Sequence, residues 1–253
     1  MSRPHMATEK LTAEQELARR SRRSFIALGA GAIGAVAAWY WLNSQPLADE
    51  IPRPLRRVLG WNESVVRNVL YSDRHLVRTY PASAVGKIKV NGVIGMEQPI
   101  DQAAWYLDLA PLGAPAQRLT IADVRSLPRH EEIIDFKCVE GWSTVTQFAG
   151  ARFSDFTARF APGSEKAAYV AMRTPSKDYY VGFDMPSALH PQSLLAYEMN
   201  GEPLTEKHGA PLRLVMPVKY GIKNIKRIGS VEYADQRPAD YWAEQGYDYY
   251  SGL

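Results

Sequence analysis

The sequence has one cysteine among its 253 residues, Cys138, and only five histidines. A single cysteine excludes an internal disulfide framework, so a packed core has to hold the fold. The histidines show neither an HExxH pair nor the Cys/His spacing of a zinc site. His130 lies beside Glu131 and Glu132, a grouping typical of a solvated patch rather than of an acid–base pair.

Other signatures are missing as well. The sequence has no GxxxxGK[ST] phosphate loop and no GxSxG nucleophile turn. The formal net charge is only +3, and the basic residues are mixed with acidic ones, so nothing indicates a nucleic-acid partner. Because 46% of the residues are hydrophobic, there is enough apolar material for one large domain or two small ones.

The N-terminus carries a basic cluster and then a long uncharged run. The cluster contains Arg19, Arg20, Arg22 and Arg23, and the run extends over residues 25–42. As a helix this run would be about 27 Å long, close to the thickness of a bilayer core. A buried core helix is the alternative, but the upstream arginines and the lack of a polar face disfavour it.

The segment Ser21–Ile26, SRRSFI, resembles a twin-arginine export signal, a route that carries folded proteins. Residues 35–37, Ala-Val-Ala, are a candidate cleavage site, whereas the aromatic trio at 39–41 suits the far membrane interface and favours retention as an anchor. We therefore expect a cytoplasmic basic region at 1–24, a signal or transmembrane anchor at 25–42, a linker at 43–60 and one domain at 61–253.

The domain is predicted to be α+β with a mixed sheet, because short strands outnumber helices long enough to be crossovers. A linker-like tract without periodicity, residues 45–54, precedes it. The predicted helices are Glu63–Leu70, Ile121–Leu127 capped by Thr120, and one after Ser154. The predicted strands are Lys87–Val93, Trp105–Leu109, Ile133–Val139, Ala168–Met172, Tyr179–Phe183, Leu194–Met199, Leu212–Met216 and Ser230–Tyr233.

The segment Asp135–Ser143, DFKCVEGWS, delivers Cys138 to the end of a strand, where Gly141 permits a sharp turn. A thiolate suits a metal that also carries sulfur ligands, although a lone cysteine is often only a small buried hydrophobe. With Phe148–Arg152, the segment resembles the cysteine segment of the sulfite oxidase family of molybdopterin enzymes. LAYEMNGEPL at 195–204, HGAPLR at 208–213, YGIKNIK at 220–226 and, more faintly, VNGVIG at 90–95 extend the resemblance over roughly residues 85–235.

The resemblance implies that Cys138 supplies the protein thiolate to molybdenum. It implies that His208 and Arg213 hold the pterin and its phosphate, that Asn224, Ile225 and Lys226 form a cradle for the same phosphate, and that Asn91 belongs to the entrance loop. Taken alone, Arg213 and Lys226 would be ordinary surface charges. The family's active-site tyrosine falls at Tyr179, with Tyr180 beside it.

The layout is similar to the exported bacterial branch of the family, which includes a periplasmic methionine-sulfoxide reductase catalytic subunit. We therefore expect a periplasmic Mo–molybdopterin enzyme that reduces an S-oxide or similar small oxide by oxygen-atom transfer, anchored to the inner membrane or released after signal cleavage. Its expected electron donor is a membrane haem protein or a periplasmic carrier. Sulfite oxidation is the alternative, and a cofactor-free binding domain is a third option.

Overall fold

The computed structural model describes residues 12–87 and 89–252, and the chain divides at Arg56 into two compact units. Residues 1–11 of the expected basic region, Ile88 of the expected strand Lys87–Val93, and Leu253 of the expected domain lie outside the described residues.

The first unit is dominated by the helix α1, Ala13–Asn43. Thr12 begins it as one half of a capping box with Gln15, which satisfies backbone N–H groups that a helix start leaves without partners. Its 31 residues make a helix about 46 Å long. Within the described residues, α1 is the one helix long and apolar enough to cross a membrane. It contains both the arginine cluster and the uncharged run.

The expected tether at residues 45–54 has regular structure instead. β1 (Leu47–Ala48) pairs antiparallel with β2 (Ile51–Pro52), and α2 (Arg53–Val65) follows at once. The two residues between the strands, Asp49 and Glu50, have φ angles of 50° and 62°. Positive φ at both central residues is the geometry of a tight hairpin turn, but it is usually signalled by Asn or Gly. The prediction was therefore wrong here because the turn residues are atypical.

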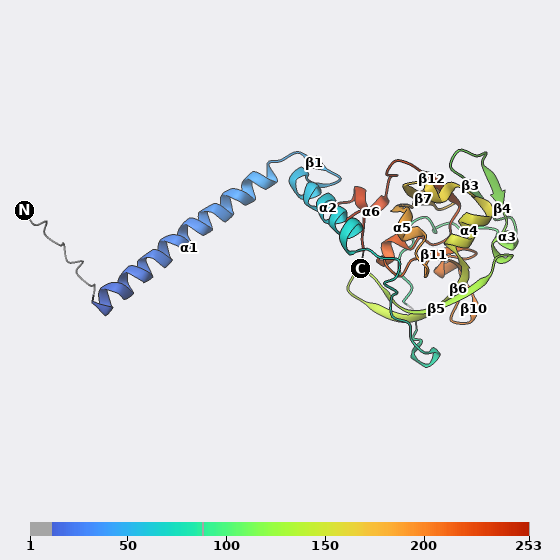
Figure 1. Cartoon of the computed structure of the whole chain (residues 1–253), viewed down its shortest axis with the longest axis horizontal. Coiled ribbons are helices and arrows are strands. Elements are labelled where there is room, and N and C mark those ends of the chain that lie inside the picture. Colours follow the sequence, from blue (N-terminus) through green and yellow to red (C-terminus); the bar gives the residue numbers. More distant parts are fainter. Residues whose placement is uncertain (1–11, 88, 253) are drawn as a thin grey trace, which may run out of the picture. The chain divides into compact units, whose positions relative to one another are not determined.

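The second unit contains two sheets with short helices around them (Figure 1). One sheet has the order β10-β9-β6-β5, with β11 also paired to β9, and its pairs are antiparallel. The other has the order β4-β3-β12-β7-β8 and is mixed, because β12 runs parallel to β3. The strands are β3 Leu107–Ala110, β4 Gln117–Leu119, β5 Arg129–Lys137, β6 Ser143–Arg152, β7 Tyr169–Arg173, β8 Tyr180–Asp184, β9 Leu194–Met199, β10 Glu202–Pro203, β11 Arg213–Val215 and β12 Ser230–Ala234.

The helices of this unit are short and lie between the strands. The α-helices after α2 are α3 Ile121–Arg125, α4 Phe153–Phe160, α5 Met185–Ala188 and α6 Tyr241–Glu244. The remaining turns are the π-helix η1 Val66–Leu70 and the 3-10 helices η2 Ala82–Ala84, η3 Ser164–Lys166, η4 Glu206–His208 and η5 Gly221–Lys223.

The alternation of side chains along the strands separates two cores. Leu214 of β11 joins the main core, which contains apolar residues of both sheets. Val215 points the other way, into a smaller cluster with Ile134 and Phe136 of β5 and Phe148 of β6. Because successive side chains of a strand point to opposite faces, Arg213 shares the face of Val215, as Cys138 continues the face of Phe136. The pleat of two strands thus directs the candidate residues to one side.

The predicted α+β class and mixed sheet are confirmed. The helix capped by Thr120 is present as α3, and the helix expected after Ser154 is α4. The expected helix Glu63–Leu70 begins ten residues earlier, at Arg53, and ends in the π-helical turn η1. The strand β6 was not predicted, although it pairs with both β5 and β9.

The expected strand Lys87–Val93 is wrong for the residues that the structure describes, 87 and 89–93, which are irregular. Gly92 has a φ of 72°, outside the range of a strand. The carbonyls of Asn91 and Gly92 accept hydrogen bonds from the Lys226 ammonium rather than from a neighbouring strand. Hydrogen bonds from the Lys226 side chain therefore take the place of the strand pairing that the apolar pattern predicted.

Candidate active site

Cys138 lies at the tip of the β5–β6 hairpin, directly after the last ladder pair, Lys137 and Ser143. Its backbone N–H donates to the Trp142 carbonyl at 3.0 Å, and its carbonyl accepts from the Gly141 N–H at 3.2 Å. Gly141 has a φ of 84°, which a residue with a side chain rarely adopts. The turn that the sequence suggested is therefore present, and it holds a buried thiol.

Arg213 is buried in β11, 2% exposed, and its guanidinium lies against a pair of aromatic rings whose centres are 5.7 Å apart. The guanidinium carbon lies 5.5 Å from the ring centre of Phe136 and 5.1 Å from that of Phe148. One terminal nitrogen donates to the His208 carbonyl at 3.3 Å, whereas the Nε–H has no hydrogen-bond partner among the described residues. Burial lowers the pKa of Arg213 to about 10, so the group still carries its charge at neutral pH.

A cavity of about 180 Å³ connects these two residues. The predicted site residues Asn91, Cys138, Tyr179, His208, Arg213, Asn224 and Lys226 line it, together with others that the sequence analysis did not select. The exception is Ile225, which is fully buried in the main core. The full lining is Lys89, Asn91, Gly92, Ile94, Met96, Phe136, Cys138, Val139, Glu140, Trp142, Tyr179, His208, Arg213, Gly221, Ile222, Asn224, Lys226, Trp242 and Tyr247.

Lys226 fastens the entrance loop to the rest of the cavity wall. Its ammonium donates to the carbonyls of Asn91, Gly92 (3.2 Å) and Lys207 (3.3 Å). The Asn91 side-chain amide in turn lies 3.7 Å from the Cys138 sulfur. Burial and the neighbouring guanidinium lower the pKa of Lys226 to about 8. In this arrangement Lys226 orders the loop that brings an amide donor to the thiol.

His208 ends η4, and Gly209 follows with a φ of 97°. A Cβ at Gly209 would come within 2.7 Å of the Lys226 side chain, so this position requires glycine for its space as well as for its conformation. Burial, then the charges of Arg213 and Lys226, lower the pKa of His208 to about 4. The ring is therefore neutral at pH 7, with one N–H to donate and one nitrogen to accept.

Asn224 lines the cavity, but its side chain also builds the loop around it. Its oxygen accepts from the Met216 N–H at 2.5 Å, and its amide donates to the carbonyls of Lys219 (3.3 Å) and Tyr220 (3.0 Å). These bonds use most of what an amide side chain offers. The structure therefore gives Asn224 a role in shaping the loop after β11.

The two neighbouring tyrosines have different surroundings. Tyr179 lines the cavity, and its hydroxyl donates to the Ile222 carbonyl at 2.5 Å. Burial, followed by the charge of Asp240, raises the pKa of Tyr179. The Tyr180 hydroxyl instead bonds Glu244, outside the cavity. Of the two, Tyr179 is therefore the one that lines the cavity, with a neutral hydroxyl.

Three aromatic residues that line the cavity, Trp142, Trp242 and Tyr247, were not selected from the sequence. Trp142 comes from the hairpin tip, and its indole N–H donates to Glu140 at 3.0 Å. Trp242 and Tyr247 come from the C-terminal Tyr-rich segment, and their rings lie 5.1 Å apart. Only Trp142 had a signal in the sequence, since it falls within the cysteine segment.

The cavity suits a group that carries both an anion and a metal. Arg213 offers a buried, unpaired N–H donor, which an anionic group would satisfy. Within residues 12–87 and 89–252, no group of three or more His, Cys, Asp or Glu side chains comes together at Cys138 or elsewhere. A metal at Cys138 would therefore bring its remaining ligands on a cofactor. A phosphorylated pterin with sulfur donors fits both conditions.

Comparisons with known proteins agree with a cofactor of this kind in the cavity. Residues 95–242 match the sequence model of the oxidoreductase molybdopterin binding domain. The chain is 30% identical over 254 residues to the protein-methionine-sulfoxide reductase catalytic subunit MsrP of Campylobacter jejuni, with 92% of this chain and 81% of the relative covered. It is 31% identical over 190 residues to a provisionally named protein-methionine-sulfoxide reductase subunit, YedZ1, of Azospira oryzae, with 74% and 72% covered.

Among solved structures, the sulfane dehydrogenase SoxCD of Paracoccus pantotrophus aligns with a TM-score of 0.51 at 19% identity. The alignment covers 55% of this chain and 40% of that chain. At this identity the likeness shows a common fold.

Proposed function

Because the chain belongs to the family of oxidoreductases with a molybdopterin binding domain, we propose that it reduces an S-oxide with molybdenum–molybdopterin held around Cys138. The observation that carries the proposal is the shared cavity of a hairpin-tip thiol and a buried arginine with an unpaired N–H. When bound, the cofactor supplies a two-electron centre for oxygen-atom transfer. The overall reaction takes an S-oxide, two electrons and two protons to the sulfide and water.

Different residues of the cavity would bind the metal and the pterin phosphate of the cofactor. Cys138 donates its thiolate to the metal, and the Asn91 amide, 3.7 Å from the sulfur, can donate a hydrogen bond that tunes it. Arg213 pairs with the cofactor phosphate, for which a guanidinium is suited because it donates two parallel N–H groups. Neutral His208 adds a further donor to the pterin.

In the proposed reaction, Tyr179 supplies a hydrogen bond to the oxygen that leaves the substrate; its support is that the side chain lines the cavity. Its hydroxyl is neutral because its pKa is raised. The single proton of this hydroxyl is bonded to the Ile222 carbonyl, so Tyr179 would exchange that partner for the substrate oxygen. In the reducing direction that oxygen gains protons, so a neutral O–H donor stabilises the charge that develops on it.

The lining of the cavity favours a neutral S-oxide over anionic sulfite. The lysines at the cavity are already engaged: Lys89 lies 3.9 Å from Glu140, and Lys226 is bound by three carbonyls. Trp142, Trp242 and Tyr247 offer aromatic surface, against which a thioether or S-oxide sulfur packs well. Both relatives named above are methionine-sulfoxide reductase subunits.

The proposed location is the periplasmic side of the inner membrane, with α1 as an anchor or as a cleaved signal. Its support is the uncharged run in α1 behind the arginines, an arrangement that leaves the basic end in the cytoplasm. Electrons would come from a membrane haem protein or a periplasmic carrier, since the reaction needs a two-electron donor outside this chain.

A substrate panel tests the function. The purified, cofactor-loaded protein is assayed with a reduced viologen dye against methionine sulfoxide, free and in peptides, and against dimethyl sulfoxide. Sulfite is tested in the opposite direction with an electron acceptor, and Cys138→Ser is the inactive control. We expect dye oxidation with S-oxides that the Ser variant loses; turnover of sulfite with no S-oxide reduction would reverse the proposed direction.

A further inference from the structure

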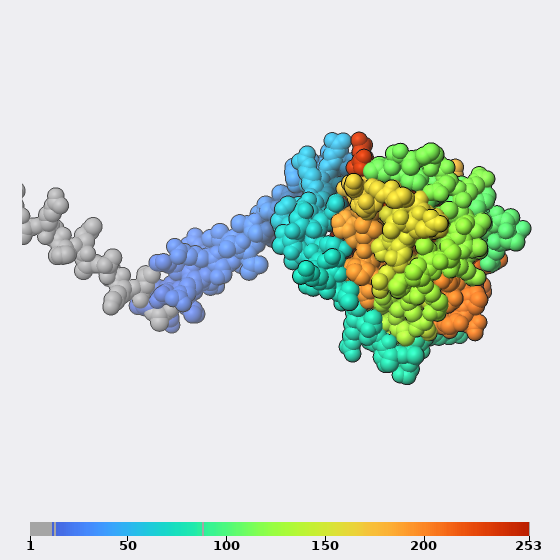
Figure 2. Space-filling model, turned by 45° about the vertical axis from the view of Figure 1, so that its right-hand side comes forward, coloured from blue at the N-terminus to red at the C-terminus, as the bar shows by residue number. Residues whose placement is uncertain are grey.

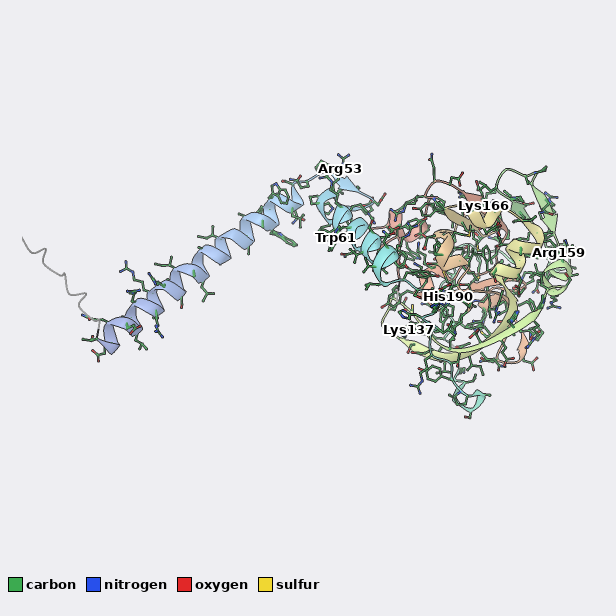
Figure 3. All side chains as sticks on the ribbon, in the orientation of Figure 1. Arg53, Trp61, Lys137, Arg159, Lys166 and His190 are labelled. Carbon is green, nitrogen blue, oxygen red and sulfur yellow. The ribbon has the colours of Figure 1, made fainter. Side chains whose placement is uncertain are left out.

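The helix α2 and the turn η1 present apolar side chains to the outside of the second unit. The exposed fractions of Val58, Trp61 and Val69 are 53%, 67% and 73%, and half-buried Val65 lies between them. We call these four residues the outer stripe. Their spacing of three and four residues places Val58, Trp61 and Val65 on one face of the helix. Figure 2 shows α2 and the segment after it at the surface of this unit, and Figure 3 labels Trp61 on α2.

The one residue of α2 that is buried is charged, whereas an ordinary surface helix buries apolar residues. Glu63 is buried and binds Arg237 and Arg67, the latter at 3.3 Å. Arg67 also donates to the Tyr169 hydroxyl at 3.1 Å and lies 4.0 Å from Asp184. Ion pairs thus hold the helix against the second unit, and its apolar side faces outward. Exposure of this apolar surface to water is unfavourable.

The chain itself indicates what covers the outer stripe. Residues 44–52 alone separate the end of α1 from the start of α2, and so short a segment spans at most about 33 Å. If α1 crosses a bilayer, α2 begins at its surface. Arg53 and Arg57 are exposed on α2, where they can meet lipid phosphates, and tryptophan is a side chain typical of the membrane interface.

We propose that α2 lies in the membrane interface, with the outer stripe inserted between lipid headgroups and the upper acyl chains. The inference rests on the proposed insertion of α1 and is independent of the reaction. It gives the domain a second, non-spanning contact with the membrane, which restricts how the catalytic unit can turn on its anchor.

Spin labels on single cysteines test this in the full-length, cofactor-loaded protein, reconstituted in vesicles of phosphatidylcholine and phosphatidylglycerol. Labels at Val58→Cys and Val69→Cys report the stripe. Gly60→Cys is the matched control, because it is exposed with open space around it and lies two residues, roughly 200°, round the helix from position 58. Ile33→Cys marks the bilayer core, and labelled wild type gives the background from buried Cys138.

Oxygen partitions into lipid and a nickel chelate stays in water, so their relative access to each label reports its depth. We expect the oxygen-to-nickel ratio at positions 58 and 69 to be several-fold above that at position 60, and below that at position 33. If the nickel chelate had equal access to the labels at positions 58, 60 and 69, the outer stripe would be exposed to water, and the proposal would be overturned. Shielding of 58 and 69 from both reagents would also overturn it, in favour of a protein contact. Water exposure at position 33 would refute the anchor itself, whatever the pattern on α2.

Discussion

Replacing the buried arginine by an unbranched apolar residue should destabilise the protein far more with cofactor than without it. In Arg213→Met the side chain still packs against the rings of Phe136 and Phe148 but carries no charge. In the loaded protein the change leaves a buried phosphate partly unpaired, at a cost of about 3 kcal/mol, which corresponds to roughly a hundredfold loss of cofactor affinity.

In the cofactor-free protein the same change removes a buried charge whose Nε–H has no partner among the described residues. The lost hydrogen bond to the His208 carbonyl and the lost contacts with the two rings cost about 1–2 kcal/mol. Removing the buried cation, which has no compensating negative charge, stabilises the folded state by about 1–3 kcal/mol and so offsets this cost. The two effects are of similar size, so we expect the melting temperature without cofactor to change little.

The assay is the difference in melting temperature between loaded and cofactor-free protein. A loss of about 3 kcal/mol in a unit of this size should narrow that difference by roughly 6–12 °C. Arg173→Met is the control, since Arg173 packs over the Tyr180 ring at 5.4 Å and lies outside the cavity lining. If Arg213→Met kept its full cofactor content, and if the difference in melting temperature between loaded and cofactor-free protein did not change, Arg213 would not hold the phosphate.

Three further predictions concern the thiol, the histidine and the export signal. Cys138→Ser should abolish turnover but change the free energy of unfolding by no more than about 1 kcal/mol, because a hydroxyl is a harder metal ligand of nearly the same size; a Ser variant with most of its activity would make Cys138 an ordinary core residue. The pKa of His208 is lowered to about 4 from 6.5, so the unfolded chain gains a proton first as the pH falls. Cofactor-free protein should therefore lose up to about 3 kcal/mol between pH 6.5 and pH 4 in urea titrations, and His208→Gln should lose clearly less; identical pH profiles would refute this. Changing Arg22 and Arg23 together to Lys should keep the protein in the cytoplasm in cell fractionation, because lysine lacks the planar guanidinium fork; unchanged export would point to the general secretory route.

Strand periodicity and sequence blocks predicted much of the cavity, because Cys138 and Arg213 are directed by alternation along strands that the pattern reveals. The strand β6 was missed since its Ala149-Gly150-Ala151 stretch lacks the bulky alternation of a strand. Glycine is required at position 150 because a Cβ there would come within 2.0 Å of the Leu195 carbonyl. Close approach of two strands selects glycine, and a sequence pattern alone does not show the approaching strand.

The sequence was also insufficient where the cavity depends on distant segments. Tyr179 could not be distinguished from Tyr180 until the structure placed one at the cavity and the other on Glu244. Trp242 and Tyr247 line the cavity, although no pattern in the sequence connects them with the cysteine segment. Such contacts depend on how the C-terminal segment returns to β8, which neither composition nor local periodicity specifies.

If Cys138 and Arg213 hold a molybdenum–molybdopterin cofactor, the cofactor content per chain is the most direct measurement of it. The protein should be purified from cells that make molybdopterin, then analysed for metals by mass spectrometry and for pterin by fluorescence after oxidation. We expect close to one molybdenum and one pterin per folded chain, in a fixed ratio across preparations. Zinc, a nucleotide or no cofactor in protein from such cells would contradict it.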